Sequence, residues 1–455
     1  MGVEIWILIF HGGFQMFQKF PISKLTLALL TLPLASLTHA AGMDRSGQDV
    51  SAFLQDGTYA EAVYTYLDAD VSGKDNDGNK TGDIADSYDF FRYGVKTDIN
   101  DTFSIGVLYD EPFGAEAAYS GDNNFVSGGP SDAARFTSQL ANIEALGNTL
   151  PVPGADGIEK AITAGVVTQE QINLLGASAQ AASQSTAGEG TDVSVRTYSL
   201  TGILGVKLGE NKNYQIYAGP VGQKAEGEVE LRGTAYGPAN GYNAAMASDT
   251  AAGWLAGFSY SKPEIALKAA LTYRSEIDHK LKASEAFTGA LAPFNGGSEV
   301  KVTTPESVNF DFQTGINPTT LATAKVRWVP WSDFRIEPPI YSGATQLPLV
   351  DYSDDQWQVE LGLGKKLADN FSISGSIGWD SGAGDPTSSL GPVDGYYSVG
   401  LGAKYDMTKN WAISAGGKYL MLGDAKGSLP NGSIVADFDD NDAYAVGIKL
   451  SYQDK

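Results

Sequence analysis

The sequence predicts an all-β fold, a transmembrane antiparallel β-barrel of about fourteen strands. Three observations support this prediction. Many segments alternate apolar residues with small or polar ones, as a strand with two different faces requires. The connections between these segments are alternately short and long. Beyond the leader, no apolar run reaches the roughly 18 residues that a membrane-spanning helix needs.

The hairpin formed by residues 397–421 shows the strand pattern most clearly. Gly, Ser and Lys dominate one face of both segments. The other face is apolar, with aromatic residues toward its ends: Tyr397, Val399, Leu401, Ala403, Tyr405, Trp411, Ile413, Ala415, Tyr419 and Met421. In a soluble sandwich that face would be a core rich in Leu, Ile and Val. Aromatic ends and a small polar face are typical of a strand with lipid outside and a wet lumen inside.

Fourteen segments follow this pattern, and an even number is usual in single-chain bacterial barrels. The predicted strands are 59–68, 88–97, 103–119, 194–208, 214–232, 251–260, 265–281, 303–316, 322–334, 355–366, 371–380, 396–405, 411–422 and 443–452.

The connections give the orientation of the barrel. The short ones are 98–101, 209–213, 261–264, 317–320, 367–370 and 406–410. The longer ones, rich in Gly and Asp, include 69–87, 233–250, 282–302, 335–354, 381–395 and 423–442. Because periplasmic turns are short and external loops long, both chain termini are expected on the periplasmic side.

The composition excludes several classes of function. The net charge is -23, which argues against nucleic-acid binding because that requires a basic surface. The chain has no Cys and three His, of which His11 and His39 lie in the leader. One remaining His, His279, disfavours Cys/His metal sites and histidine-dependent hydrolases. We therefore expect no enzyme activity, no metal site and no cofactor.

The N-terminus resembles a secretory leader. A short basic region from Met16 to Lys24 precedes an apolar stretch, 25–37, and small residues at 38–41 that suit cleavage. Translation from Met16 is the simpler hypothesis, so residues 1–40 are assigned to the leader and signal peptide. Residues 41–57 lack alternation and are either a loose tail or a plug folded into the lumen. The barrel is assigned to 58–455.

The third strand contains a sequence that interrupts alternation. Pro112, Phe113 and Gly114 follow two acidic residues. Pro cannot donate to the strand ladder and Gly often marks a bulge, so these residues predict a kink or an opening in the wall. The alternative is that the strand simply ends at Tyr109.

The long external loop, 120–192, contains helical patterns. Ser131 is a candidate N-cap for one helix, and Thr168 with Gln171 fits a capping box for another. Short amphipathic helices must bury their apolar stripes against each other or against the barrel mouth. They either form a groove for a ligand or close the loop's own small core. The candidate groove residues are Phe136, Leu140, Ile143, Leu146, Ile172, Leu174 and Leu175.

The chain resembles the FadL family of outer-membrane long-chain fatty acid transporters, the OmpP1/FadL/TodX group, over most of its mature length. The similar segments are 66–73 (YLDADVSG), 271–276 (LTYRSE), 304–306 (TPE), 331–334 (WSDF) and 411–423. The resemblance implies fourteen strands, an N-terminal plug, a helical third external loop and a kinked third strand that opens laterally into the bilayer. The chain departs from the family in its short plug, which lacks an Asn-Pro-Ala motif, and in ending on Lys455 rather than on an aromatic residue.

Physical chemistry favours apolar capture with a cation for orientation. Each buried CH2 contributes roughly 0.8 kcal/mol, whereas an exposed ion pair contributes about 0.2–1 kcal/mol. The alternation places four cations on the lumen face: Lys268, Arg274, Lys325 and Arg327. They either meet a ligand carboxylate or pair with lumen acids such as Glu276 and Glu360.

The sequence thus predicts passive transport of long-chain fatty acids or similar hydrophobic molecules across the bacterial outer membrane. The expected partners are a fatty acid or hydrocarbon ligand, outer-membrane lipid and lipopolysaccharide, and the barrel assembly machinery during biogenesis. Acidic loop clusters at 75–78 and 437–442 lack calcium-loop spacing and are expected to be solvated. The alternatives are a general diffusion porin and a structural outer-membrane barrel. The sequence leaves the choice of hydrophobic substrate open.

Overall fold

The computed structural model describes residues 43–454, so the predicted signal peptide lies outside the described residues. The chain forms a closed antiparallel barrel of 14 strands, in which the first strand pairs with both the second and the last. This confirms the predicted fold class. Three of the strands are broken into two pieces: the third strand, and the seventh and eighth, which are neighbours. The strands are β1 (Thr58–Asp70), β3 (Tyr88–Asp98), β4 (Phe103–Asp110) with β5 (Gly114–Ala118), β6 (Asp192–Leu208), β7 (Tyr214–Leu231), β8 (Tyr242–Lys262), β9 (Leu267–Arg274) with β10 (Ile277–Ala286), β11 (Gly296–Thr304) with β12 (Ser307–Asn317), β13 (Thr320–Val329), β16 (Gln356–Ala368), β17 (Phe371–Asp380), β19 (Tyr396–Asp406), β20 (Trp411–Leu422) and β23 (Asp442–Asp454).

The outer face of the barrel carries the apolar residues of each strand. Leu401, in the middle of β19, is 69% exposed, whereas its neighbours on the lumen side are glycines. Exposed aromatic residues mark two levels. The level near the short turns includes Phe103, Tyr214, Tyr405 and Trp411; the level near the long loops includes Trp254, Trp357, Trp379, Tyr397, Tyr419 and Tyr444. This is the arrangement of an outer-membrane barrel with two aromatic girdles.

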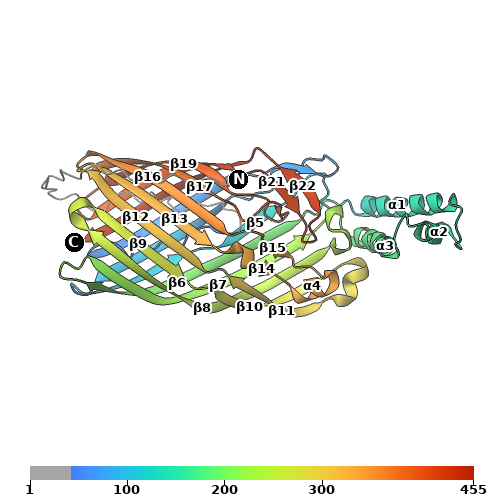
Figure 1. Ribbon diagram of the computed structural model, residues 1–455, viewed down its shortest axis with the longest axis horizontal. Helices are drawn as coiled ribbons and strands as arrows, with labels where there is room; N and C mark the ends of the chain where they lie inside the picture. The colour runs from blue at the N-terminus through green and yellow to red at the C-terminus, as the bar shows by residue number, and fades with distance from the viewer. Residues whose placement is uncertain (1–42, 455) are drawn as a thin grey trace, which may run out of the picture.

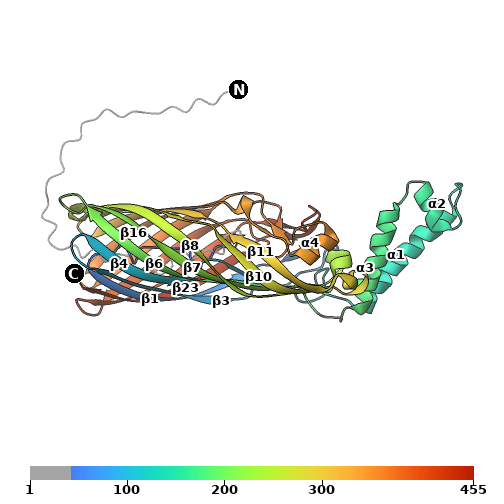
Figure 2. The same ribbon diagram turned by 90° about the horizontal axis from the view of Figure 1, so that it is seen from below.

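The two ends of the barrel differ as predicted. The short turns and the C-terminus lie at one end, and the long connections lie at the other (Figure 1). Three helices, α1 (Pro130–Asn148), α2 (Gly157–Thr163) and α3 (Gln169–Gln184), project beyond the long-loop end (Figure 2). No helix among residues 43–454 is both long and apolar enough to cross a membrane. The capping box of Thr168 is confirmed, but Ser131 is not an N-cap: α1 starts one residue earlier, after Gly129.

Other short elements cover the long-loop end. A small sheet joins the loops in the order β18–β21–β22–β2. Its strands and the remaining elements are β2 (Gly73–Asp75), β18 (Thr387–Ser388), β21 (Ala425–Ser428), β22 (Ile434–Phe438), β14 (Arg335–Ile336), β15 (Val350–Asp351), η1 (Thr234–Ala239), η2 (Pro263–Ile265), η3 (Gly289–Phe294), η4 (Trp331–Asp333) and α4 (Pro339–Thr345).

Several strands continue further outward than predicted. β8 begins at Tyr242, and β10 and β11 occupy most of 282–302, so these parts of the predicted loops are strand. Conversely, β13 ends at Val329, before the predicted end at residue 334. The extended part of β10 alternates buried residues, such as Leu281, with exposed lysines such as Lys280 and Lys282. Its outer face is charged because it stands above the hydrocarbon core of the bilayer, and a charged face resembles a loop in sequence.

Residues 43–57 lie inside the lumen as a short plug. Their apolar side chains, including Val50, Phe53 and Leu54, pack against the walls formed by β4 and β6 to β9. The ring of Phe53 rests on Gly106 and Gly205, where an added Cβ would come within 2.7 and 2.8 Å of it. Glycine on the lumen face therefore lets the plug pack tightly against the wall.

The depth of the lipid-facing strands gives a test of the fold. Leu401→Arg places a charge near the middle of the bilayer and is expected to cost about 2–4 kcal/mol of folding free energy, whereas Tyr405→Arg, at the girdle, should cost about 0–1 kcal/mol. Reversible guanidinium unfolding from lipid vesicles, followed by tryptophan fluorescence, measures both. Equal costs at the two positions would contradict the assignment of β19 as a membrane-spanning strand.

Candidate functional site

The third strand is kinked rather than ended. β4 stops at Asp110, and β5 resumes at Gly114 against the same neighbour, β6. On the other side, β4 pairs with β3 only as far as Tyr93. Residues 88–92 of β3 pair with β1 but not with β5. The wall therefore has a gap in its backbone ladder between β3 and β5, beside the predicted kink residues Pro112, Phe113 and Gly114.

The start of the plug fills this gap from inside. Gly114 N donates to Met43 O over 2.8 Å, and Arg45 N donates to Pro112 O over 2.7 Å. The Arg45 guanidinium lies 3.7 Å from the centre of the Tyr88 ring. Residues 43–45 thus act as a short strand that satisfies the backbone of the kink, which lipid cannot do.

Aromatic residues surround the gap on both sides. Outside, ring contacts of 5.2–5.9 Å link Tyr64, Phe91, Tyr93 and Tyr109. Inside, Phe113 meets Trp331 edge to face, with ring centres 5.7 Å apart. Aromatic rings therefore flank both faces of the gap.

Behind the kink lies an apolar cavity with about 460 Å³ of space free of protein atoms. Its lining extends from Met43 and Phe113 at the kink across the lumen to the wall formed by β7, β8, β10 and β11. The other lining residues are Val195, Thr197, Ala225, Glu226, Gly227, Met246, Leu281, Val302, Thr304, Pro305, Phe334 and Ile336. The aliphatic and aromatic side chains of this lining suit an apolar ligand.

One buried cation lies beside this cavity. Arg274 is 3% exposed, and its Nη1 donates to Thr201 Oγ1 over 3.2 Å. Thr201 lies on the same lumen face of β6 as Thr197, which lines the cavity, and is four residues closer to the short turns. Arg274 is paired across the sheet with Ser307, which is two residues from the lining residue Pro305. The opposing charge that acts on Arg274 most strongly is the buried Asp110 carboxylate, but among the described residues Nε and Nη2 of Arg274 have no hydrogen-bond partner. A buried guanidinium with free donors is suited to a carboxylate.

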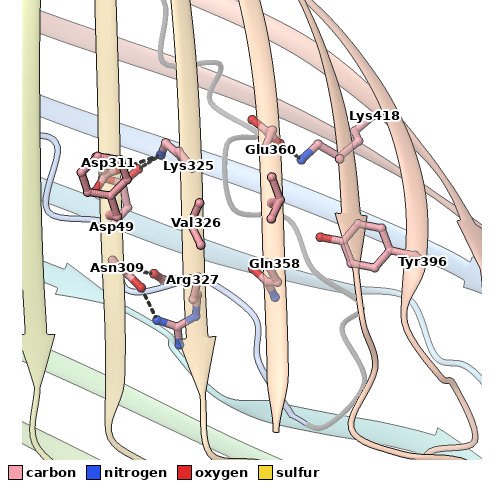
Figure 3. Close-up of a pocket in the computed structure, with 14 residues that line it drawn as sticks. Asp49, Asn309, Asp311, Lys325, Val326, Arg327, Gln358, Glu360, Tyr396 and Lys418 are labelled. Atoms are coloured by element: carbon pink, nitrogen blue, oxygen red, sulfur yellow. Dashed lines mark hydrogen bonds and ion pairs between the residues drawn. The ribbon is translucent and has the colours of Figure 1, made fainter. Parts of the chain in front are cut away.

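The other three predicted cations hold the plug. Lys325 Nζ lies 2.8 Å from Asp49 Oδ2 and 3.6 Å from Asp311 (Figure 3). Arg327 makes two hydrogen bonds to Asp44, the Nε–Oδ2 distance being 2.5 Å. Lys268 donates to the Leu54 carbonyl oxygen. Lys325 and Arg327 line a separate polar cavity of about 490 Å³, and acids of the protein balance their charges.

The acids expected to pair with these cations have other roles. Glu276 is exposed, because it lies in the break between β9 and β10. Glu360 lies 2.5 Å from Lys418 on β20 (Figure 3). Lys325 and Arg327 do pair with acids inside the lumen, which was one of the two alternatives, but the acids are Asp49, Asp311 and Asp44 rather than Glu276 or Glu360. Alternation in the sequence predicts which side chains face the lumen. It does not predict which acids of the plug will pair with them.

The seven predicted groove residues lie on the projecting helices. Phe136, Leu140, Ile143, Ile172 and Leu175 are half-buried, while Leu146 and Leu174 are each 48% exposed. The helices pack on each other, and the base of α3 rests on η1 and η3 at the barrel mouth, with Gly289 N donating to Gln184 Oε1 over 3.0 Å. The hydrogen bonds from Arg135 and Asn124 lower the pKa of Asp77 and join the base of α1 to a neighbouring loop.

Sequence reasoning missed the lining of the apolar cavity. A signal was present in β6, where the lumen face changes from Thr201, Ser199 and Thr197 to Val195 and Val193 toward the outside. That change from polar to apolar on the inner face indicates a dry compartment in the outer half of the barrel.

Comparisons with known proteins agree with this architecture. Residues 172–453 match the family described as outer membrane protein transport protein (OMPP1/FadL/TodX). A FadL homologue from Pseudomonas aeruginosa has a similar structure, with a TM-score of 0.62 and 16% identity over 91% of this chain and 95% of that chain. The toluene transporter TodX of P. putida has a TM-score of 0.54 and 11% identity, over 89% of this chain and 91% of that chain. The Ralstonia pickettii toluene transporter TbuX has a TM-score of 0.53 and 11% identity, over 94% of this chain and 100% of that chain. No curated protein matches the sequence.

The family match covers well over half of the chain, and the solved structures share its fold. The resemblance seen in the sequence is therefore confirmed. The protein is an outer-membrane transport channel rather than an enzyme, and it belongs to the OMPP1/FadL/TodX family.

Proposed function

We propose that this channel carries long-chain fatty acids, or amphiphiles of similar shape, passively across the outer membrane. The family and fold support transport of hydrophobic compounds in general. The observation that favours an amphiphile is the apolar cavity with the incompletely paired Arg274 beside it. A hydrocarbon would use only the cavity, whereas a fatty acid would use both.

The energetics favour the apolar cavity as the main source of affinity. At roughly 0.8 kcal/mol per buried CH2, a chain of about sixteen carbons gains on the order of 10 kcal/mol before ordering costs. The carboxylate must give up its hydration when it enters the barrel, and the free donors of Arg274 replace it. The cavity therefore supplies affinity, and Arg274 sets the orientation of the ligand.

The route begins at the external helices and ends at the kink. Leu146 and Leu174 offer exposed apolar contacts beyond the barrel mouth, and the half-buried residues between α1 and α3 become available if the helices separate. At the other end, residues 43–45 act as the gate. Their withdrawal from Pro112, Phe113 and Gly114 would open the gap between β3 and β5 to the bilayer.

The lumen argues against a general diffusion porin. The plug is held by ion pairs from Asp44 and Asp49 to the wall, and its apolar face is packed on the opposite wall. A sugar-sized solute would have to displace both sets of contacts. A structural barrel without a ligand leaves the dry cavity and the buried Arg274 without a role.

Filling the cavity should reduce uptake while the barrel still folds. Ala225→Phe adds a ring to the cavity lining, and a cost of about 1–3 kcal/mol for overpacking the occupied cavity predicts a roughly 5- to 150-fold loss of oleate uptake. The assay is uptake of labelled oleate by cells that lack their own transporter. The matched control is Ala415→Phe, the same substitution on the lipid face of β20.

Both variants must first show the heat-modifiable migration of a folded barrel. Normal uptake by the Ala225→Phe variant would rule out the cavity as the route. No oleate uptake by the unaltered protein would contradict the fatty-acid assignment itself. The double variant Leu140→Asp with Leu175→Asp tests capture by the helices in the same assay and should slow uptake at low oleate concentration.

Arg274 should discriminate between acids and neutral ligands. A hydrogen bond to a charged group contributes about 1.5–3 kcal/mol, so Arg274→Gln is expected to weaken oleate binding roughly 10- to 150-fold and to leave oleyl alcohol binding unchanged. Arg274→Lys should restore part of the oleate affinity. Calorimetry or ligand competition on the purified protein gives both dissociation constants. Equal losses for oleate and oleyl alcohol would mean that Arg274 has only a structural role.

A further inference from the structure

A second interruption in the wall is separated from the kink by β6, β7 and β8. β8 pairs with β9 from Lys262 to Leu255 and with β10 from Met246 to Asn243. Between these two ladders, residues 247–253 of β8 face residues 276–282, which are Glu276 and the first part of β10, without ladder pairing. The number of residues on the two strands is equal, so this is a seam between strands in register rather than an inserted loop.

The neighbouring strands are irregular at the same level. The register between β7 and β8 shifts between Ala225 and Gly227, which leaves residues 247 and 248 of β8 bulged and exposed. β11 and β12 are separated by Pro305 and Glu306. In Figure 1, β8, β10 and β11 run along the lower edge of the barrel toward the helices. Three adjacent irregularities weaken one patch of wall just outside the girdle residue Trp254.

The seam borders the apolar cavity directly. Met246 of β8 and Leu281 of β10, whose side chains are 7% and 3% exposed, lie on its two sides and line the cavity. Ala225 and Gly227, on the bulge, line it as well. The same cavity reaches Met43 and Phe113 at the kink. It therefore lies between two interruptions of the wall.

Side chains close the seam in place of the backbone ladder. Asp249 Oδ2 on β8 lies 3.1 Å from His279 Nδ1 and accepts a hydrogen bond from Lys280 N over 3.2 Å. His279 Nε2 also lies 3.0 Å from Gln223 Oε1 on β7. At the inner end of the seam, Ser275 N donates to Trp254 O. These few bonds are easier to break than a ladder of seven rungs.

We infer that the seam between β8 and β10 is a lateral inlet, latched by Asp249, through which an amphiphile passes from the headgroup layer of the outer leaflet into the apolar cavity. This inference rests on the proposed function and adds a second way in, separate from the helices. The rim suits an anionic headgroup: Lys280 and Lys301 are directly opposite each other, and both are exposed. Asp278 and Glu299 lie on the same face and offset the positive charge of the lysines. The lysines therefore orient a carboxylate that has reached the rim rather than raise the local concentration of anions.

A reversible lock tests the inlet, and the absence of native Cys makes the introduced thiols unique. Ala247→Cys with Lys282→Cys places two exposed residues opposite each other at the first unpaired position of the seam. In the Leu140→Asp with Leu175→Asp background, where capture by the helices is weakened, oxidation should reduce the remaining oleate uptake at least tenfold, and dithiothreitol should restore it. The control is Ala245→Cys with Ser284→Cys, two residues further out on the same face, where the strands are already paired. Oxidation of the control pair should change nothing.

The outcomes separate the inlet from the proposed function. Full uptake by the oxidised lock variant overturns the inlet. No uptake by the unaltered protein overturns the fatty-acid assignment and is seen before any oxidation.

A second measurement does not depend on the lock variant being active. Leu281→Cys places a thiol in the cavity wall, and an alkyl maleimide added outside the cell reports access to it. Asp249→Ala should speed this labelling several-fold in the Leu281→Cys background, because it removes the latch. An unchanged labelling rate in a folded barrel would overturn the inference.

Discussion

The structure depends on one constraint: at membrane depth, every backbone N–H and C=O needs a hydrogen-bond partner within the protein. A closed ladder of strands meets this constraint everywhere except where the sequence interrupts it. At the kink of the third strand, residues 43–45 of the plug replace the missing neighbour through the bonds from Gly114 N to Met43 O and from Arg45 N to Pro112 O. The plug and the gap in the wall are therefore coupled, since moving the plug leaves Gly114 N and Pro112 O without these partners, while Phe113 keeps its hydrogen bonds to Thr197.

The plug also divides the lumen into two environments. Its acids hold Lys325 and Arg327 in a polar compartment, while its apolar residues and Met43 face the opposite walls. An apolar ligand gains little from the polar side, where every entering group would have to compete with ion pairs. The dry cavity behind Phe113 offers the opposite conditions: apolar lining, one cation with free donors and two adjacent interruptions of the backbone ladder. Selectivity for hydrophobic molecules follows from this division.

The sequence predicted what depends on local periodicity. The fourteen strands, the helical loop and the kink at Pro112 each come from residues close in the chain, and so does the Thr168 capping box. Prediction from the sequence failed where ion-pair or packing partners come from segments distant in the chain. Lys325 and Arg327 were placed on the lumen face, but their pairing with Asp49 and Asp44 depends on how the plug folds back. The outer parts of β8, β10 and β11 resembled loops because their exposed face meets water rather than lipid. The apolar cavity was missed because its lining comes from elements far apart in sequence.

The most direct test of this account is a crystal structure of the protein bound to a fatty acid brominated near its methyl end. The anomalous signal of bromine locates the tail without assumptions about the rest of the ligand. The account predicts a bromine peak inside the cavity between Phe113 and Leu281, with the carboxylate toward Arg274. A peak only between α1 and α3, or within the polar compartment around Lys325, would contradict it.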